Sequence, residues 1–210
     1  MRYRIIPVTS YQQNCSLLIC EKTQQAVIVD PGGDTDALIK IIAQENVSLQ
    51  SILLTHGHLD HVGGSVALAA HYDLPIIGPH QGDDFWLNAL PEQARHFGFP
   101  HCPAFTPTRW LNHGDVVEFG NERLDVFHCP GHTPGHLVFV NRSAKLALVG
   151  DVLFKGSIGR TDFPGGDHQT LIDSIRQNLW PLGKDIQFVP GHGAMSTFGE
   201  EMRSNPYVHN

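Results

Sequence analysis

The amino-acid sequence predicts a single α/β domain, residues 1–210, in which two mixed β-sheets pack together with helices outside. Three observations lead to this prediction. Short apolar runs recur in both halves of the chain, with helix-like segments between them. No linker, charge block or fixed-period repeat divides the chain. With 210 residues, 41% of them hydrophobic, the chain is long enough to bury roughly 70% of its unfolded surface.

The first half contains apolar, β-branched runs and three helix-like segments. Asp34 follows the turn signal PGG and is predicted to cap a helix over residues 35–46, whose apolar residues recur at helical spacing. Residues 62–72 are predicted as the next helix, and residues 83–99 as a helix interrupted at Pro91. The predicted strands cover residues 3–8, 14–20, 25–30, 49–54 and 74–78.

The second half follows the same pattern. Residues 167–180 are predicted as a helix capped by Asp167, and the stretch 195–206 is predicted to contain a last helix that stops before Pro206. The predicted strands form two hairpin pairs, 115–120 with 122–130 and 136–141 with 145–151, followed by a final strand and loop over 186–193.

Composition excludes several classes of function. The net charge is −7 and no run of Lys or Arg stands out, so we expect no nucleic-acid partner. No signal peptide and no stretch of ~20 apolar residues is present, which predicts a cytoplasmic protein without a membrane span. The cysteines show no Cys-x-x-Cys spacing and are expected to be reduced, with Cys129 in the core.

Histidine is unusually frequent, with 14 residues, and the placement of several histidines indicates a metal site. Four apolar strands are each followed by a polar loop with candidate ligands, and loops on a rigid sheet suit a preorganised site. Imidazole and carboxylate ligands without thiolate suit zinc, iron or manganese, and seven ligands are too many for one tetrahedral ion. The candidate ligands are His56, His58, Asp60, His61, His132, Asp151 and His192.

The remaining nine histidines are placed outside the site. Two of them, His128 and His136, lie near His132 and could hydrogen-bond a ligand or a loop carbonyl. Asp30, at the end of a predicted strand, is interpreted as a turn residue with a supporting role as the alternative.

The motifs THGHLDH, PGHTPGH, Gly150–Asp151 and PGH at His192 resemble those of the metallo-β-lactamase superfamily along nearly the whole chain. Within it, YRIIPV, QNC, VDPGGD and GDVLFKGSIGRTDFPGGD are similar to the short, single-domain type of glyoxalase II, a hydroxyacylglutathione hydrolase. The resemblance implies an αββα sandwich with two divalent metal ions, zinc first and iron or manganese as alternatives. It assigns His56, His58 and His132 to one ion and Asp60, His61 and His192 to the other, with Asp151 bridging.

The resemblance also places a basic glutathione contact at Arg160. Longer glyoxalase II enzymes add a C-terminal helical region that helps to hold glutathione, whereas here about one helix follows His192. Arg160 could bind a substrate carboxylate by a two-pronged hydrogen bond, or it could pair with Asp162 or Asp167 to hold its own loop.

These features predict a hydrolase whose partner is a small-molecule thioester, a glutathione conjugate such as S-lactoylglutathione. Two ions would lower the pKa of a shared water towards ~7. Asp60 and Asp151 are the candidate catalytic carboxylates, with Asp60 orienting the attacking group. The alternative within the superfamily is a persulfide dioxygenase with one iron, held by His56, His132 and Asp151.

Overall fold

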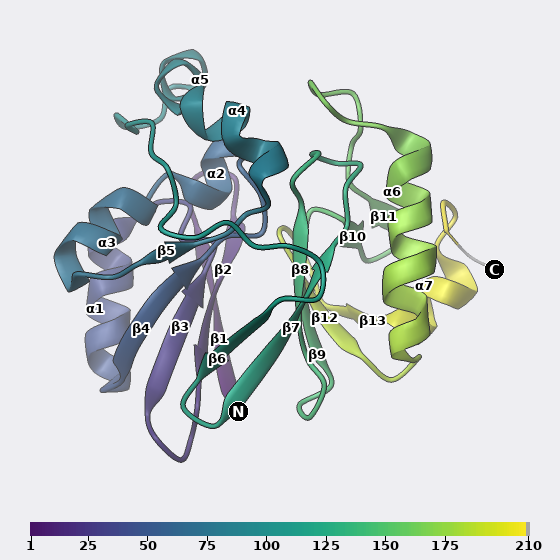
Figure 1. Cartoon of the computed structure of the whole chain (residues 1–210), viewed down its shortest axis with the longest axis horizontal. Helices are drawn as coiled ribbons and strands as arrows, with labels where there is room; N and C mark the ends of the chain where they lie inside the picture. Colours follow the sequence, from purple (N-terminus) through teal and green to yellow (C-terminus); the bar gives the residue numbers. More distant parts are fainter. Residues whose placement is uncertain (209–210) are drawn as a thin grey trace.

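The computed structural model describes residues 1–208 and contains two large β-sheets that face each other, with helices on both outer sides (Figure 1). The first sheet has the order β1 (Arg2–Val8), β2 (Gln13–Ile19), β3 (Gln25–Val29), β4 (Ser48–Leu53) and β5 (Ile76–Ile77). The second has the order β13 (Ser196–Thr197), β12 (Gln187–Pro190), β9 (Leu146–Gly150), β8 (Leu137–Asn141), β7 (Glu122–His128) and β6 (Val116–Phe119). A separate hairpin joins β10 (Leu153–Phe154) and β11 (Ser157–Ile158).

Both sheets are mixed, as predicted. In the first sheet, β3 pairs in parallel with β4 and β4 with β5, whereas β1, β2 and β3 pair antiparallel. In the second, β12 and β9 are parallel and the other pairs antiparallel.

The central strands are apolar along their whole length because both faces of each sheet are buried. Alternate residues of a strand point to opposite faces. Leu17 of β2 and Ile28 of β3 pack into the core under the helices of the first sheet, whereas their neighbours Leu18 and Val27 pack between the sheets. That inner core also contains Phe139 of the second sheet. This arrangement confirms the predicted sandwich of two sheets with outer helices.

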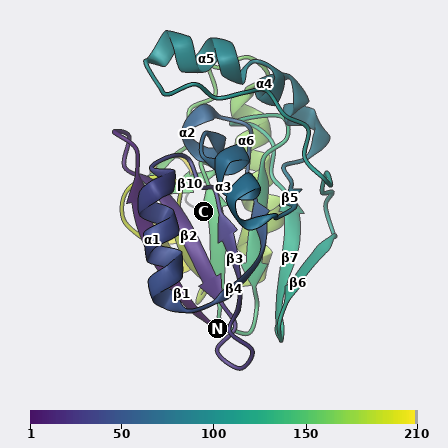
Figure 2. The same ribbon diagram turned by 90° about the vertical axis from the view of Figure 1, so that its left-hand side faces the viewer.

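Helices cover the outer faces. Figure 2 shows α1 and α3 over the outer face of the first sheet, and Figure 1 shows α6 beside the second. The helices near the first sheet are α1 (Thr35–Glu45), α2 (Leu59–Val62), α3 (Ser65–Tyr72), the 3₁₀ turn η1 (Gln81–Asp83), α4 (Asp84–Asn88) and α5 (Leu90–Phe97). Those near the second sheet are α6 (His168–Ser174), which continues as η2 (Ile175–Leu179) and η3 (Trp180–Leu182), and α7 (Phe198–Ser204). None of the helices in residues 1–208 is long and apolar enough to cross a bilayer.

Details of the predicted helices and loops differ in the structure. Asp34 occupies the N-cap position of α1, as predicted, but it has φ 50° and its side chain does not cap the helix. Its carboxylate instead accepts a hydrogen bond from the Thr9 amide (2.7 Å). The break in residues 83–99 falls at Ala89, and Pro91 lies in the first turn of α5, where a missing N–H costs nothing. The histidine cluster is not a loop throughout, because its last part forms the short helix α2. The Asp167 cap is confirmed, since its carboxylate accepts from the Thr170 amide (2.7 Å).

Candidate metal centre

The predicted ligands meet because the strands that precede them end at one edge of the sandwich. β7 and β9 are both antiparallel to β8, and β12 is parallel to β9, so these three strands run in the same direction. Their carboxyl ends therefore lie at the same edge of the second sheet. His132, Asp151 and His192 follow these ends, and the His56–His61 segment follows β4 of the facing sheet.

The first group contains His56, His58 and His132. His58 Nδ1 lies 3.2 Å from His56 Nε2 and 3.0 Å from His132 Nε2, and all three side chains are buried. Nitrogens bound at the usual 2.0–2.1 Å to one tetrahedral zinc lie about 3.3 Å apart. The three ring nitrogens thus have nearly the spacing of ligands to a single ion.

The second group contains Asp60, His61 and His192, whose ligand atoms also lie within 4.8 Å of one another. His192 Nε2 is 3.1 Å from Asp60 Oδ2. Asp60 and His61 are adjacent on α2, so their side chains leave the helix in different directions. His61 is fully buried, whereas the Asp60 side chain is 23% exposed and lines the cavity in front of the site.

Asp151 lies between the two groups. Its Oδ1 is 3.3 Å from His61 Nε2, and its Oδ2 is 3.6 Å from His132 Nε2 and 3.8 Å from His192 Nε2. A single carboxylate therefore contacts histidines of both groups. This position is the one that a bridging ligand would occupy.

The hydrogen bonds of the histidines fix which nitrogen faces the centre. The Nδ1–H groups of His61, His132 and His192 donate to Asp30 Oδ2 (2.9 Å), the Arg160 carbonyl (2.7 Å) and the Tyr11 carbonyl (3.1 Å). Their Nε2 lone pairs are left to point inward. Such outer contacts orient imidazole ligands in known metal sites.

His56 is held in the same way through a relay. Thr55 donates its hydroxyl to Asp30 (2.5 Å), and its oxygen can accept from His56 Nδ1 (3.0 Å). Asp30 has φ 51°, which fits the predicted turn, but it is also buried and supports two ligands. Asp30 therefore has the supporting role that the sequence analysis left open, because it orients His61 directly and His56 through Thr55.

Electrostatics distinguishes the two groups. Burial lowers the pKa values of His56 and His132 and lowers that of His58 to about 3, so these imidazoles are neutral and their lone pairs available. In the second group, burial also opposes protonation, yet the carboxylates of Asp151 and Asp60 raise the pKa of His61 well above its usual value. The field at the second group therefore favours a positive charge.

Two buried atoms of the site lack a hydrogen-bond partner and fit a cation. These atoms are His61 Nε2 and Asp151 Oδ1. Because His61 donates through Nδ1, its Nε2 lone pair and the Asp151 oxygen are two acceptors facing each other. Unpaired buried acceptors are costly, and a cation between them removes that cost. The residues present thus fit two divalent ions.

Asp83 is a site residue that sequence reasoning missed. It is fully buried and accepts hydrogen bonds from the Gly57 amide (2.8 Å), the Thr133 hydroxyl (2.8 Å) and the Gly135 amide (2.6 Å). Burial raises its pKa to about 6. These contacts connect the loop that carries His56 and His58 to the loop that carries His132.

His136 and His128 have the supporting contacts considered from the sequence. The Asp151 amide donates to His136 Nε2 (3.0 Å), and His128 Nε2 donates to the Pro134 carbonyl (2.8 Å). All four cysteines are free and buried, and Cys129 belongs to the core beneath α6, as predicted.

The Arg160 side chain lines the cavity but is already paired. Its Nε and Nη2 donate to the two Asp162 oxygens at 2.7 and 2.6 Å, and its guanidinium lies 4.1 Å above the Phe163 ring. Of the two pairings considered from the sequence, the structure contains the one with Asp162. The contact of Arg160 with the metal centre is made by its backbone, through the carbonyl that accepts from His132.

Comparison with known proteins identifies relatives along nearly the whole chain. The family model described as the metallo-beta-lactamase superfamily matches residues 8–192. A relative from Haemophilus influenzae, named hydroxyacylglutathione hydrolase GloC, is 49% identical over 209 residues, covering 99% of this chain and 98% of the relative. The solved structure of the BLEG-1 B3 metallo-beta-lactamase has a TM-score of 0.91 and 36% identity, with both chains fully covered. TTHA1623 in a di-iron-bound form has a TM-score of 0.89 and 33% identity, covering 98% of this chain and all of that one.

Proposed function

Since this chain belongs to the metallo-beta-lactamase superfamily, we propose that it is a metal-dependent hydrolase of thioesters, with S-lactoylglutathione as substrate and lactate and glutathione as products. The name and the near-complete alignment of the Haemophilus influenzae relative support this substrate class. The observation that carries the proposal is Asp151, whose two oxygens face histidines of both ligand groups. We further propose that residues 1–210 act as one domain.

We propose that His56, His58 and His132 hold one divalent ion, zinc first and iron or manganese as alternatives. Asp60, His61 and His192 hold a second, and Asp151 contributes to both. When bound, the two ions supply the acidity that makes water a nucleophile near neutral pH and the positive charge that stabilises the oxyanion. The solved di-iron form of TTHA1623 supports a two-ion site for this fold.

The residues of the chain supply position and shielding. Asp60 lines the cavity, where its carboxylate can accept a hydrogen bond from the attacking water and aim the oxygen at the thioester carbonyl. The aromatic rings of Trp86 and Phe163 lie edge-on against His58 and cover that side of the first ligand group. The departing thiolate needs no dedicated proton donor, because the pKa of an ordinary thiol is only ~8.5.

The test is a pair of assays on one sample that was purified without oxygen. S-lactoylglutathione cleavage is followed by thiol release, and oxygen uptake is followed with glutathione persulfide. The proposal predicts rapid thiol release without oxygen uptake. Oxygen uptake without thioester cleavage would instead identify a persulfide dioxygenase.

A further inference from the structure

The cavity in front of the metal centre has a predominantly aromatic wall. Its volume is about 580 Å³, within the range of small-molecule sites. Five of the candidate metal ligands form its floor. Its walls include the aromatic side chains Tyr11, Trp86, Phe97, Phe99, Phe154 and Phe163.

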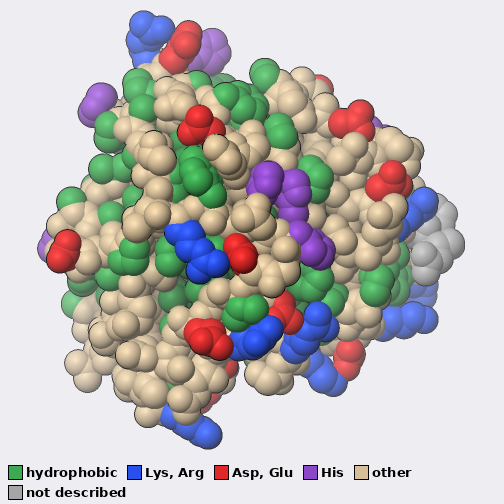
Figure 3. All heavy atoms as spheres, in the orientation of Figure 1, with side chains coloured by type: hydrophobic (Ala, Val, Ile, Leu, Met, Phe, Trp, Pro, Cys, Tyr) green, Lys and Arg blue, Asp and Glu red, His purple; other side chains and the backbone are tan. Residues whose placement is uncertain are grey.

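This wall runs from the first ligand group to the rim of the cavity. Trp86 and Phe163 meet His58 edge-on, with ring centroids 4.6 and 5.3 Å away. Farther out, Tyr11 stacks on Phe99 with centroids 5.4 Å apart, and Phe97 at the end of α5 is 51% exposed. Aromatic rings that remain accessible beside a reactive centre are typical of a binding surface. In Figure 3, hydrophobic side chains gather on the upper left of the molecule, where Figure 1 places α4 and α5.

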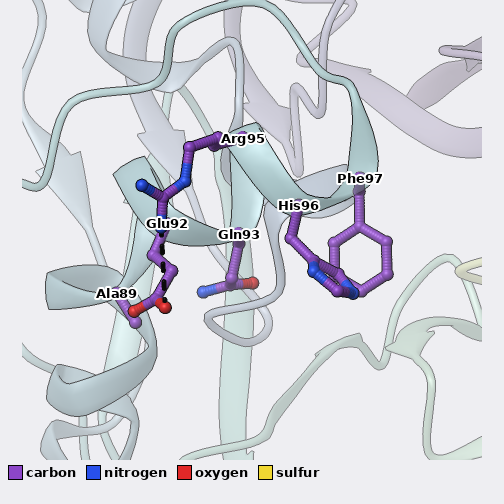
Figure 4. Close-up of a pocket in the computed structure, with 6 residues that line it drawn as sticks. All are labelled: Ala89, Glu92, Gln93, Arg95, His96 and Phe97. Atoms are coloured by element: carbon purple, nitrogen blue, oxygen red, sulfur yellow. Dashed lines mark ion pairs between the residues drawn. The ribbon is translucent and has the colours of Figure 1, made fainter.

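Positive charge for an anionic substrate is scarce at this wall. Among the described residues that line the cavity, Arg160 is the one Lys or Arg, and Asp162 binds its guanidinium at both oxygens. Asp162 has a pKa of about 2, mainly because of that hydrogen bond, so the pair persists at neutral pH. Arg95 lines the adjacent hollow along α5, where Gln93 and Phe97 also lie, and it faces Glu92 at 3.8 Å (Figure 4).

We propose that the aromatic wall is a subsite for an apolar, aromatic substituent on the acyl group of the thioester. The inference rests on the proposed function and narrows its substrate class. Glutathione carries two carboxylates and an ammonium group, which an uncharged aromatic wall matches poorly. The acyl group is the part of the substrate that can gain from burial there, and a lactoyl group offers only one methyl for this contact. The preferred substrates are therefore glutathione thioesters of aromatic acids.

The first test measures binding alone. S-benzylglutathione and S-methylglutathione share the tripeptide and differ by one phenyl ring, and neither has a thioester to cleave. Calorimetry on the metal-loaded protein should give an affinity at least about tenfold higher for the benzyl compound, as expected for burial of an aromatic ring. Phe97→Ala should bring this ratio towards one. Tyr207→Ala removes a ring with the same 51% exposure outside the cavity lining and should leave the ratio unchanged.

The second test measures turnover of S-mandeloylglutathione and S-lactoylglutathione, which differ only by phenyl in place of methyl. The proposal predicts kcat/KM about tenfold higher for the mandeloyl thioester, and a ratio that falls in Phe97→Ala but not in Tyr207→Ala. Tighter binding of the benzyl compound without cleavage of either thioester would overturn the proposed function and support the aromatic subsite. Equal affinities, or cleavage without preference for the mandeloyl thioester, would overturn the subsite even if the chain is a thioesterase.

Discussion

The Asp83 carboxylate accepts a hydrogen bond (2.8 Å) from the backbone amide of Gly57, the residue between His56 and His58. The same carboxylate oxygen accepts from Thr133, and the other accepts from Gly135. Asp83 therefore connects the two loops that carry the ligands of the first group. It lies at the end of η1, outside both loops, so their relative position depends on a residue that contacts no metal ligand side chain directly.

The first prediction concerns Asp83→Asn. All three partners are donors, and an amide has one acceptor oxygen where the carboxylate has two, so the variant must lose at least one loop contact. We expect zinc affinity to fall about 10- to 100-fold, the usual effect of removing an outer contact of a metal site. Competition with a chromophoric chelator measures this affinity. The visible spectrum of the cobalt-loaded protein should also change, because it reports ligand geometry.

The matched control is Glu201→Gln. Glu201 is another buried carboxylate, and it accepts from the Gly156 amide (2.8 Å), the Asn205 side chain (2.8 Å) and the Ser196 hydroxyl, none of which lies in the two loops that Asp83 connects. This variant should lose stability but keep the zinc affinity and cobalt spectrum of the wild type. Equal effects of both substitutions on zinc affinity would mean that Asp83 acts only through general stability.

The second prediction concerns Asp162→Asn. A neutral partner releases much of the Arg160 guanidinium, which lies at the cavity and could then bind a glutathione carboxylate. We expect an about tenfold lower KM for S-lactoylglutathione, consistent with a charged hydrogen bond of about 1.5 kcal/mol. Lowering the assay pH to 5 should not mimic the substitution, because the pKa of Asp162 is about 2. Steady-state kinetics at pH 5 and 7 checks both points, and an unchanged or higher KM would contradict the prediction.

The sequence predicts the sandwich and the seven candidate ligands because both leave a local signal. Strands such as β3, buried on both faces, read as unbroken apolar runs, and the candidate ligands directly follow such runs. Where the structure departs from prediction, the decisive contact is distant. Asp34 resembles a helix cap, but its carboxylate bonds to Thr9 instead.

Asp83 escapes sequence reasoning for a related reason. In the sequence it is one of two acidic residues at the start of a predicted helix. Two of its three donors are backbone amides, which every residue except proline carries, and they lie 26 and 52 residues away. Only the folded chain brings them together. The sequence allows Arg160 to pair with Asp162, with Asp167 or with a substrate carboxylate. Only the folded structure shows that its partner is Asp162.

The third prediction concerns Glu45, which binds Arg2 and Arg4 of β1 from the end of α1. The hydrogen bonds from Arg2 and Arg4 lower its pKa below 4.5. The folded state therefore favours the ionised carboxylate, and this stability is present above pH ~4.5 and lost as the pH falls through the lower folded pKa. Because both arginines are about 40% exposed, we expect the Glu45 ion pairs to contribute only about 0.5 kcal/mol to the free energy of unfolding.

Urea unfolding of wild type and Glu45→Gln in the presence of EDTA measures this contribution. The difference in unfolding free energy should be near its full value at pH 7 and should decrease steadily as the pH falls below about 4.5. A difference that stays constant across this range would show that the ion pair does not cause it.

The fourth prediction concerns metal removal. An ion that binds only the folded chain adds about 2.7 kcal/mol per site to the free energy of unfolding when its free concentration is 100 times its Kd. For a chain of this length, 1 kcal/mol corresponds to about 2–4 °C in Tm. Treatment with EDTA should therefore lower Tm by at least about 5 °C, and added zinc should restore it. In Asp151→Ala, which loses the carboxylate between the two groups, zinc should restore much less.

The most direct test of the two-ion hydrolase is a titration of metal-free protein with zinc, with S-lactoylglutathione cleavage measured at each point. Two ligand groups joined by Asp151 predict that the rate rises until two equivalents of zinc per chain are bound and then stays constant. A rate that is already maximal at one equivalent, or no cleavage at two, would contradict the account.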